Sequence, residues 1–515
     1  MFGYEIRIKT KRMICLMGTV IVSLALSACS RIGNVPAAPT EAPVQKITQT
    51  AAPTAMPTIA PSPEPEMPYK GDGSKYEYIM TDERDRAWEE DIVYFADRFL
   101  DKDSGHSRLI ERGCEIGDLI GSSDGAEYWI TDRYESLLDV EMREEFIARI
   151  NSLLLSIPEK SDYELKYECA EAAAILHDNN SFVPFYSAPE NDMFFPLELK
   201  DFYTKGNPEA YIVSAPEGME NLLLCRLDAI NGISFSDILE RYSGLISHES
   251  MTWPQFCFFY CGSSRLQLSY EMLCYLGVLD GEKTAIFSLT DENGAVREIE
   301  LSCVKDDESL AMVDYQQPTE SDESISAELS RLNAGEAAQY CFLEDGKTVY
   351  IRVLYWTAET YKTATEAIWA AEKAGNVQKV ILDMRGNAGG ASGGADLIRH
   401  IHALETEGGK YILTDGGLRS ESIFIAVCLR RAGDDVLLVG APAGEPANGM
   451  FFESVPFSTP NKNLKPYISS HTLMNNWPGN DDPALRPDIT VYQTLEDYKN
   501  GVDTVLKYIL RESGD

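Results

Sequence analysis

The sequence predicts an α/β protein, and three observations support this fold class. From about residue 347 to the end, apolar strand-like runs alternate with helical runs, as in a largely parallel sheet covered by helices. Between residues 193 and 305, short apolar or alternating runs are separated by Gly and Asn. Nearer the N-terminus, apolar residues recur every three or four positions. The predicted divisions are a signal at 1–29, a linker at 30–75, a helical region at 76–190, a β-rich segment at 191–310, a polar connection at 311–345 and an α/β core at 346–515.

The N-terminal helical region is predicted from its apolar spacing. "RAWEEDIVYFADRFL" places Trp88, Ile92, Phe95 and Phe99 on one helical face, and "EEFIARINSLLLSI" repeats this pattern. "DYELKYECAEAAAIL" predicts a further helix, with Asp162 near its N-cap. We therefore expect helices from Asp85 to about Pro158 and beyond, ending at "HDNNSFVPF".

The two later regions are predicted element by element. In the β-rich segment, "RLDAINGISFSDILERY" reads as a strand, an Asn-Gly turn, a short strand and a helix. In the core, "TVYIRVLYW", "KVILDM", "KYILTD" and "DVLLVG" are predicted strands. The predicted helices between them are "ATEAIWAAEKAG", "ADLIRHIHAL" and "SIFIAVCLRRAG", and "LEDYKNGVDTVLKYILRE" is expected to form one final helix.

The first 29 residues have the features of a targeting segment. Basic residues precede the apolar run "MICLMGTVIVSLALSA", which ends at "LSAC". A small residue before a cysteine resembles a bacterial lipoprotein signal, so Cys29 is expected to carry a lipid. The alternative is an uncleaved anchor helix, for which the run is short. Either interpretation places the body outside the cytoplasm and tethers it to a membrane, on a Pro-, Ala- and Thr-rich spacer.

Charge and cysteine content exclude some partners. The formal net charge of −37 disfavours nucleic acid and anionic membrane surfaces. Of the 11 cysteines, one lies in the signal and one is the proposed lipid site. The others form no CxxC pair and stand mostly in apolar surroundings, so we expect buried thiols and no metal site. A Cys257–Cys261 bridge is left open.

The stretch "VILDMRGNAGG" places polar groups and glycines directly after a buried strand. Asp383, Arg385 and Asn387 can bond to one another and to loop carbonyls, which would fix the turn. Glycine allows a sharp turn and close approach to backbone N–H groups. We therefore expect Gly389 or Gly390 to offer an N–H donor to an oxyanion.

Ser420 stands at the predicted start of the "SIFIAVCLRRAG" helix. A hydroxyl at this position is commonly an N-cap. The same position lies beside free N–H donors and the positive end of the helix dipole, which stabilise an anion. Ser420 is therefore a candidate nucleophile, with the N–H of Glu421 as a second oxyanion donor.

These residues resemble a known family. "VILDMRGNAGG" is similar to the Asp-Leu-Arg-Gly-Asn-Gly-Gly segment of the C-terminal-processing (tail-specific, S41-like) serine peptidases, and "RSESIFIAVCLRRAG" to their nucleophile helix. "LRPDITVYQTLEDYKNGVD", "WEEDIVYFADRFL" and "CRLDAINGISFSDIL" extend the resemblance over roughly residues 85–515. It implies a crotonase-like (ClpP-like) core with a PDZ-like segment, and cleavage of a protein or peptide, at C-terminal tails or internally, without metal or cofactor.

The chain departs from the family at the general base. One branch uses a lysine some two dozen residues after the serine, but here "LLVGAPAGEPANGM" has Glu445 and Pro446 nearest that place. The other uses a histidine in an Asp-x-His-Thr segment, where this chain has Asn180. The alternatives for the base are His177, His248 and His471, with Asp481 or Asp482 as the orienting acid. Otherwise the protein is a catalytically impaired relative that binds peptides.

A rival arrangement uses a different serine. "GASGG" satisfies the G-x-S-x-G pattern of α/β-hydrolases, and Ser392, Asp435 and His471 follow the chain order of that triad. However, the polar run "DMRGNAGG" separates Ser392 from its strand, whereas the elbow serine belongs directly after the strand. We therefore prefer Ser420 as the nucleophile.

Overall fold

The described part of the chain forms a largely helical region, an antiparallel sheet with helices and an α/β core, in this order along the sequence. The computed structural model describes residues 68–101, 119–123, 126–131, 140–185, 193–204, 206–261, 267–305, 310–318, 329, 332, 335–391, 393–475, 477 and 480–511. Cys29 and the predicted signal and linker lie outside these residues, as does Ser392.

The N-terminal helical region consists of amphipathic helices packed against one another. They are α2 (Glu83–Leu100), α5 (Val140–Ser156) and α6 (Asp162–Ala174). The predicted apolar face of α2 is confirmed, since Trp88, Ile92, Phe95 and Phe99 are all buried. The N-cap of α6 is Ser161 rather than Asp162, because the Ser161 side chain accepts the N–H of Glu164 in a capping box.

A hairpin interrupts this region, so the prediction of continuous helix was wrong there. Strands β1 (Leu119–Ser123) and β2 (Ala126–Thr131) pair with each other, and β2 pairs with β18 (Tyr467–Asn475). Together with β17 (Met450–Pro456) they form a sheet in the order β1-β2-β18-β17. The core segment therefore sends a hairpin out to the N-terminal region.

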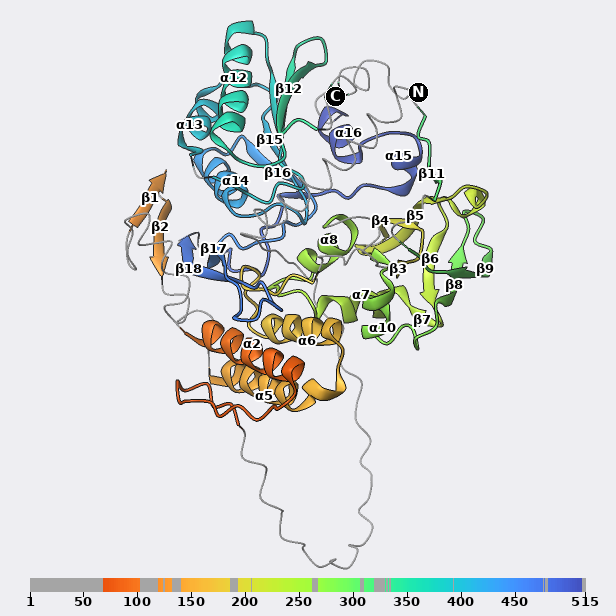
Figure 1. Ribbon diagram of the computed structural model, residues 1–515. Coiled ribbons are helices and arrows are strands. Elements are labelled where there is room, and N and C mark those ends of the chain that lie inside the picture. Colours follow the sequence, from red (N-terminus) through yellow and green to blue (C-terminus); the bar gives the residue numbers. More distant parts are fainter. Residues whose placement is uncertain are drawn as a thin grey trace, which may run out of the picture.

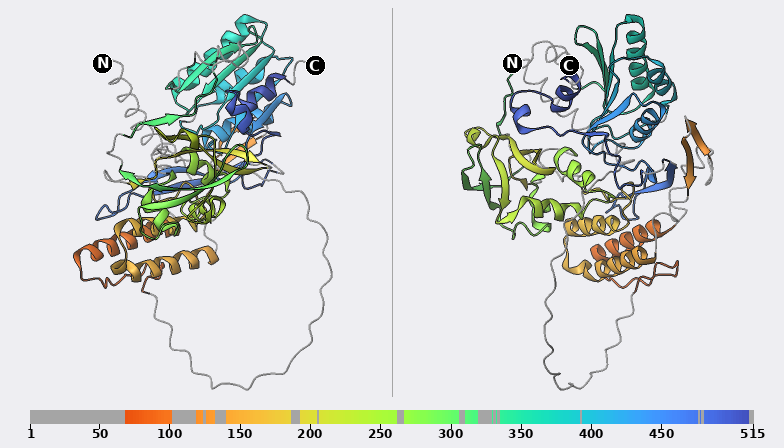
Figure 2. Two further views of the ribbon diagram at one scale, coloured as in Figure 1. Left: turned by 90° about the vertical axis from the view of Figure 1, so that its right-hand side faces the viewer. Right: turned by 180° about the vertical axis from the view of Figure 1, so that it is seen from behind.

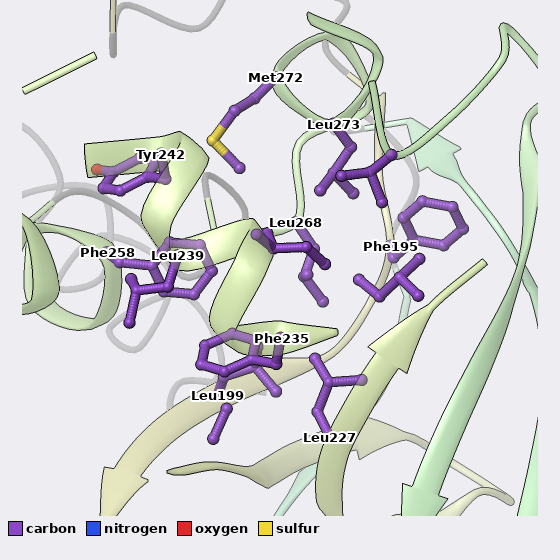
Figure 3. Packing of buried hydrophobic residues seen from close by; sticks show 14 of the residues in the cluster. Phe195, Leu199, Leu227, Phe235, Leu239, Tyr242, Phe258, Leu268, Met272 and Leu273 are labelled. Carbon is purple, nitrogen blue, oxygen red and sulfur yellow. The ribbon is translucent and has the colours of Figure 1, made fainter. Parts of the chain in front are cut away.

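The β-rich segment forms an antiparallel sheet with helices packed on it. Its main sheet has the order β11-β5-β6-β8-β9, with β4 paired to β5 and β7 to β6. Figure 3 shows the apolar contacts between sheet and helices, with Leu199 and Leu227 facing Phe235 and Leu239. Cys257 and Cys261 are both free thiols, so the bridge left open is absent. The elements are β3 (Met193–Phe194), β4 (Glu198–Thr204), β5 (Asn207–Pro216), β6 (Arg226–Ile230), β7 (Ile233–Ser234), α7 (Phe235–Ser243), α8 (Thr252–Tyr260), α10 (Tyr270–Tyr275), β8 (Thr284–Thr290), β9 (Val296–Ser302), β10 (Val304–Lys305) and β11 (Met312–Asp314).

The core is the predicted α/β layer. Its sheet has the order β12-β13-β14-β15-β16-β19, parallel from β13 onward and antiparallel between β12 and β13. Strands β14 and β13 are buried on both faces, as expected for a sheet between two layers. The elements are β12 (Ala338–Leu343), β13 (Thr348–Val353), α12 (Ala358–Ala374), β14 (Lys379–Asp383), α13 (Ala395–Ala403), β15 (Lys410–Thr414), α14 (Glu421–Ala432), β16 (Val436–Gly440), β19 (Ile489–Thr490), α15 (Leu495–Lys499) and α16 (Thr504–Arg511).

Two predicted boundaries of the core need correction. The polar connection at 311–345 contains β12, which is an edge strand of the core sheet. The expected single final helix is two helices, because Gly501 adopts φ +68° between α15 and α16.

The parts are arranged with the core and the helical region at opposite ends. Figures 1 and 2 show the β-rich segment and the β17–β18 hairpin between them in every view. The carboxyl ends of β14 and β15 therefore face the rest of the molecule. None of the described helices combines the length and apolar character needed to cross a membrane.

Candidate active site

Ser420 is the residue directly before α14, but its side chain does not cap the helix. Its backbone lies at φ +53°, ψ −124°, a conformation that costs a non-glycine residue free energy. Its side chain makes no capping hydrogen bond, so the N-cap interpretation is wrong. The residue is only 4% exposed, and no described residue forms a hydrogen bond with its hydroxyl. An uncommitted hydroxyl on a strained turn is what a nucleophile requires.

The glycine turn after β14 packs directly against Ser420. A Cβ added to Gly389 would lie 2.3 Å from the Cβ of Ser420 and 2.9 Å from its Oγ. The chain therefore comes this close only because residue 389 has no side chain. At Gly390 the added Cβ would lie 2.2 Å from the carbonyl oxygen of Trp356. The Ser420 side chain therefore faces the glycine turn.

The polar residues of the turn fix it as expected. Arg385 donates two hydrogen bonds to Asp383, of 2.9 and 2.6 Å, and a third of 2.7 Å to Asp503. Asn387 donates to the carbonyl of Val353 at 2.9 Å and accepts the N–H of Arg419 at 2.9 Å. The turn is thereby tied both to β13 and to the residue before Ser420.

The charge of Asp383 is stabilised inside the protein. Burial by itself would raise its pKa, but the Arg385 guanidinium and the Tyr350 hydroxyl together hold that pKa below its usual value. Tyr350 donates to Asp383 at 2.6 Å. The aspartate therefore stays ionised and keeps Arg385 in place.

The backbone N–H groups of Gly389 and Gly390 differ in whether they are free to bind an oxyanion. The N–H of Gly389 donates to Oδ1 of Asn387 at 3.0 Å, so the expectation that it serves as an oxyanion donor is corrected. The N–H of Gly390 has no acceptor among the described residues, because the bridge to Trp356 uses the carbonyl of Gly389 and the N–H of Ala391. Glu421 is the first residue of α14. Gly390 is therefore the better oxyanion donor of the two glycines.

The Glu421 side chain joins the helix start to the glycine loop. Its Oε1 accepts the hydroxyl of Tyr361 at 2.7 Å and the N–H of Gly393 at 3.2 Å. Burial and the nearby carboxylate raise the pKa of Tyr361, so the phenol remains a donor. Tyr361 also stacks on Trp356 at 4.6 Å. These contacts hold the loop at a fixed distance from α14.

The segment expected to supply a histidine does approach the nucleophile turn. Asn179 accepts a hydrogen bond from Arg419 at 3.4 Å, and Arg419 also lies 3.6 Å from the ring centroid of Trp253. Asn180 is fully buried and accepts the hydroxyl of Ser454 at 2.7 Å. The segment therefore has the expected position, but an amide stands where a base was expected.

The structure does not bring the histidine alternatives to Ser420. His177 is exposed, and its Nδ1 lies 3.1 Å from the carbonyl oxygen of His248. Burial lowers the pKa of His248, whose Nδ1 lies 2.6 Å from the carbonyl oxygen of Ile246. His471 is buried on β18 with Nδ1 2.6 Å from the hydroxyl of Ser470. No described histidine is hydrogen-bonded to Ser420, and His177 as the base stays a prediction.

The acids proposed to orient a histidine have other partners. Asp481 accepts the side-chain amide of Asn448 at 3.0 Å. Asp482 pairs with Arg486 at 3.0 Å. In these contacts neither acid orients an imidazole.

Glu445 is the functional candidate that sequence reasoning passed over. It is fully buried, and one carboxyl oxygen accepts the N–H of Ser420 while the other has no hydrogen-bond partner. Burial raises its pKa well above the usual value, against the smaller effect of the Ser420 N–H. The signal in the sequence was an acid in the apolar run "LLVGAPAGEPA", near the place of the missing lysine.

Of the rival triad, Ser392 lies outside the described residues. Asp435 pairs with Lys410 at 2.8 Å, and these residues precede β16 and begin β15. They therefore lie at the amino ends of the parallel strands, whereas the loop with Ser392 follows the carboxyl end of β14. Asp435 consequently lies at the edge of the sheet opposite to the carboxyl end of β14 and is engaged by Lys410. The described residues contain no group of His, Cys, Asp or Glu side chains arranged to hold a metal.

Comparison with known proteins gives distant structural likenesses. No family model and no curated protein sequence matches the chain. Among solved structures, mature CPAF is similar with a TM-score of 0.47 and 12% identity, covering 72% of this chain and 92% of that one. The photosystem II D1 C-terminal processing protease gives a TM-score of 0.34 and 12% identity, covering 74% and 94%. At this level of similarity these structures do not assign an activity to this chain.

Proposed function

We propose that this chain is a serine-type peptidase that cleaves extracytoplasmic proteins or peptides, with C-terminal tails among its substrates. The observation that carries the proposal is the strained, uncommitted Ser420 hydroxyl held against Gly389. A crotonase-like core with a PDZ-like substrate segment is part of the same proposal. The core supplies the nucleophile turn, and the antiparallel sheet of residues 193–314 would hold the peptide.

In the proposed reaction the oxygen of Ser420 forms a bond to the peptide carbonyl carbon. The carbonyl electron pair moves to its oxygen, and the N–H groups of Gly390 and Glu421 stabilise the resulting oxyanion. Such donors are effective because they are fixed before the charge develops. Collapse of this intermediate breaks the C–N bond and leaves an acyl group on Ser420, which water then removes.

Glu445 is the proposed base. Its ionised carboxylate would take the proton from Ser420 as the oxygen attacks, and would return it to the leaving amine. Oε1 has no competing partner, and Oε2 already contacts the backbone of Ser420. Hydrogen bonds in unliganded active sites are often long and shorten when substrate binds. Because burial raises the pKa of Glu445, the fraction of Glu445 that is ionised increases as pH rises.

A fluorophosphonate probe tests the proposal on the full chain. We expect labelling of the unmodified protein and none of the Ser420→Ala variant, because the probe reacts with an activated serine oxygen. The Ser392→Ala variant is the matched control and should label normally. Labelling that persists in Ser420→Ala, or that disappears only in Ser392→Ala, would contradict the assignment.

A peptide-binding protein without catalysis is the second candidate function. It is favoured by the buried amide of Asn180 at the expected position of the base, and by the lack of a histidine bonded to Ser420 among the described residues. A folded protein that resists the probe at every pH but still binds unstructured peptides would support this candidate.

The proposed location is the outer side of a bacterial cell membrane, through a lipid on Cys29. We expect Cys29→Ser to release the protein from the membrane fraction and to abolish incorporation of labelled palmitate. A single cysteine is changed, so folding of residues 68–511 should be unaffected. Membrane association that survives the substitution would favour the uncleaved anchor helix instead.

A further inference from the structure

A cavity of about 470 Å³ lies between the β-rich segment and the core. Its walls come from β4 and α8 on one side, and from the ends of β14, β15 and β16 and residues 491–505 on the other. We call it the interdomain cavity. Neither Ser420 nor Glu445 lines it, although Arg385 of the turn after β14 does. Its volume is within the range of small-molecule sites.

Lys200 supplies a positive charge to the cavity wall, near the carboxylates of Asp201 and Asp415. Its ammonium lies 3.4 Å from the Tyr260 hydroxyl, 5.0 Å from the ring centroid of Tyr260 and 5.8 Å from that of Tyr498. No carboxylate in the described part of the chain lies within ion-pair distance of it. Burial lowers the pKa of Lys200, although the nearby carboxylates of Asp201 and Asp415 act to raise it. An ammonium has three donors, so it retains capacity for an anionic ligand.

Asp415 supplies a negative charge on the core side. Its Oδ1 accepts the N–H groups of Gly386 and Gly417 at 2.8 and 2.9 Å. Its Oδ2 has no hydrogen-bond partner among the described residues. Burial raises the pKa of Asp415 to about 6, although Arg385 lies nearby. Arg385 is already engaged by Asp383 and Asp503, so Asp415 can accept a cation.

Aromatic rings cover the space between the two charges. Tyr203 stacks on Tyr492 with centroids 4.1 Å apart, and Phe256 stacks on Tyr260 at 4.9 Å. All four residues line the interdomain cavity, as does Tyr498. Such rings offer large apolar faces to a ligand. The cavity thus combines the Lys200 ammonium and the carboxylates of Asp201 and Asp415 with an aromatic wall.

We propose that the interdomain cavity binds a small zwitterionic ligand, a free α-amino acid or a dipeptide with an apolar side chain. The ligand carboxylate would lie at the Lys200 ammonium, its ammonium at Asp415 and its side chain against the tyrosine rings. A ligand with both charges satisfies both walls, whereas a simple anion or cation leaves one wall uncompensated. The proposal does not depend on Ser420 being a nucleophile.

Isothermal titration calorimetry with glycyl-L-phenylalanine tests the proposal. The full chain carries Ser420→Ala so that the probe stays intact. Glycyl-L-phenylalaninamide lacks the carboxylate, and N-acetyl-glycyl-L-phenylalanine lacks the ammonium. Each should bind about ten-fold more weakly than the dipeptide, because each loses one charge-assisted contact.

Substitutions of Lys200 and Asp415 test which residue contacts the carboxylate of the ligand and which contacts its ammonium. Lys200→Gln should remove the preference for the dipeptide over its amide, and Asp415→Asn should remove the preference over the N-acetyl form. Lys200→Arg retains the charge and should retain binding, which separates the charge from any effect on folding. Lys362→Gln, on the exposed face of α12, is the matched control and should bind as the parent does.

Two results would overturn the proposal. One is equal affinity for all three compounds in the parent chain. The other is no detectable heat with the dipeptide at about millimolar concentrations, where ligands with Kd near 1 mM are still measurable. Discrimination that is unchanged in folded Lys200→Gln and Asp415→Asn would likewise reject the assigned contacts.

Discussion

Replacing Gly389 with alanine should abolish fluorophosphonate labelling and lower the free energy of unfolding by more than about 4 kcal/mol. The added Cβ would overlap the Cβ of Ser420 at 2.3 Å and lie 2.9 Å from the carbonyl oxygen of Arg419. The two backbones cannot easily move apart, because both are already in the left-handed region. Gly389 adopts φ +91° and Ser420 φ +53°. Thermal unfolding measures the stability, and the probe reports the serine.

A second glycine separates steric overlap from backbone strain. Gly375, after α12, also has positive φ, +68°, but an added Cβ there meets nothing within 4 Å. Gly375→Ala should therefore cost only the backbone term, about 1–2 kcal/mol, and should label normally. If Gly389→Ala matched Gly375→Ala in stability and labelling, the close packing of the glycine turn on Ser420 would be wrong.

The parts of the fold with a strong local pattern could be predicted from the sequence. The strands β13 to β16 are continuous apolar runs, and α2 has apolar residues at helical spacing, so both follow from periodicity. The turn after β14 was also predictable, because Asp383, Arg385 and Asn387 bond within a few residues of one another or to the neighbouring strand. Local patterns suffice where partners are close in the sequence.

The missed elements depend on partners far away in the chain. Strand β2 joins a larger sheet through β18, where Thr131 pairs with Thr472, a contact between residues more than three hundred positions apart. Neither β1 nor β2 has the length or alternation that would identify it alone. The split of the last helix depends on Gly501, and an isolated glycine in a helical pattern is usually tolerated.

The candidate site was predicted in part for the same reason. Ser420 and the glycine turn were identified because each follows a core strand, and the parallel pairing of β14 with β15 brings them together. The hydrogen bond between Gly389 and Asn387, and the contact of Glu445 with Ser420, are properties of three-dimensional packing. The sequence identifies the residue types at these positions. It does not show which acceptor each backbone N–H contacts.

Replacing Glu445 with glutamine should reduce the labelling rate by about 10²- to 10⁴-fold at alkaline pH, the usual contribution of a general base. The amide oxygen of glutamine can still accept the N–H of Ser420, but glutamine cannot take the hydroxyl proton of Ser420. In the unmodified protein, burial raises the pKa of Glu445, so the ionised base forms only as pH rises and the rate should rise with it. The labelling rate of Glu445→Gln should not increase with pH in this way. Glu405→Gln, an exposed acid on the core, is the matched control and should label as the parent does.

The same substitution has a separate signature in stability. Because the folded state binds the Glu445 proton more tightly than the unfolded state does, its contribution to stability is complete below the unfolded pKa and is lost as pH rises through the folded pKa. Between about pH 5 and about pH 9, urea unfolding should therefore show that the free energy of unfolding falls more for the parent than for Glu445→Gln. The expected difference is about 1.4 kcal/mol for each unit by which the folded pKa exceeds the unfolded pKa. A variant that labels at the parent rate at every pH would reject Glu445 as the base. If its stability curve is nevertheless flatter, the carboxyl is buried and protonated as the structure indicates, and the proton of Ser420 must leave by another route.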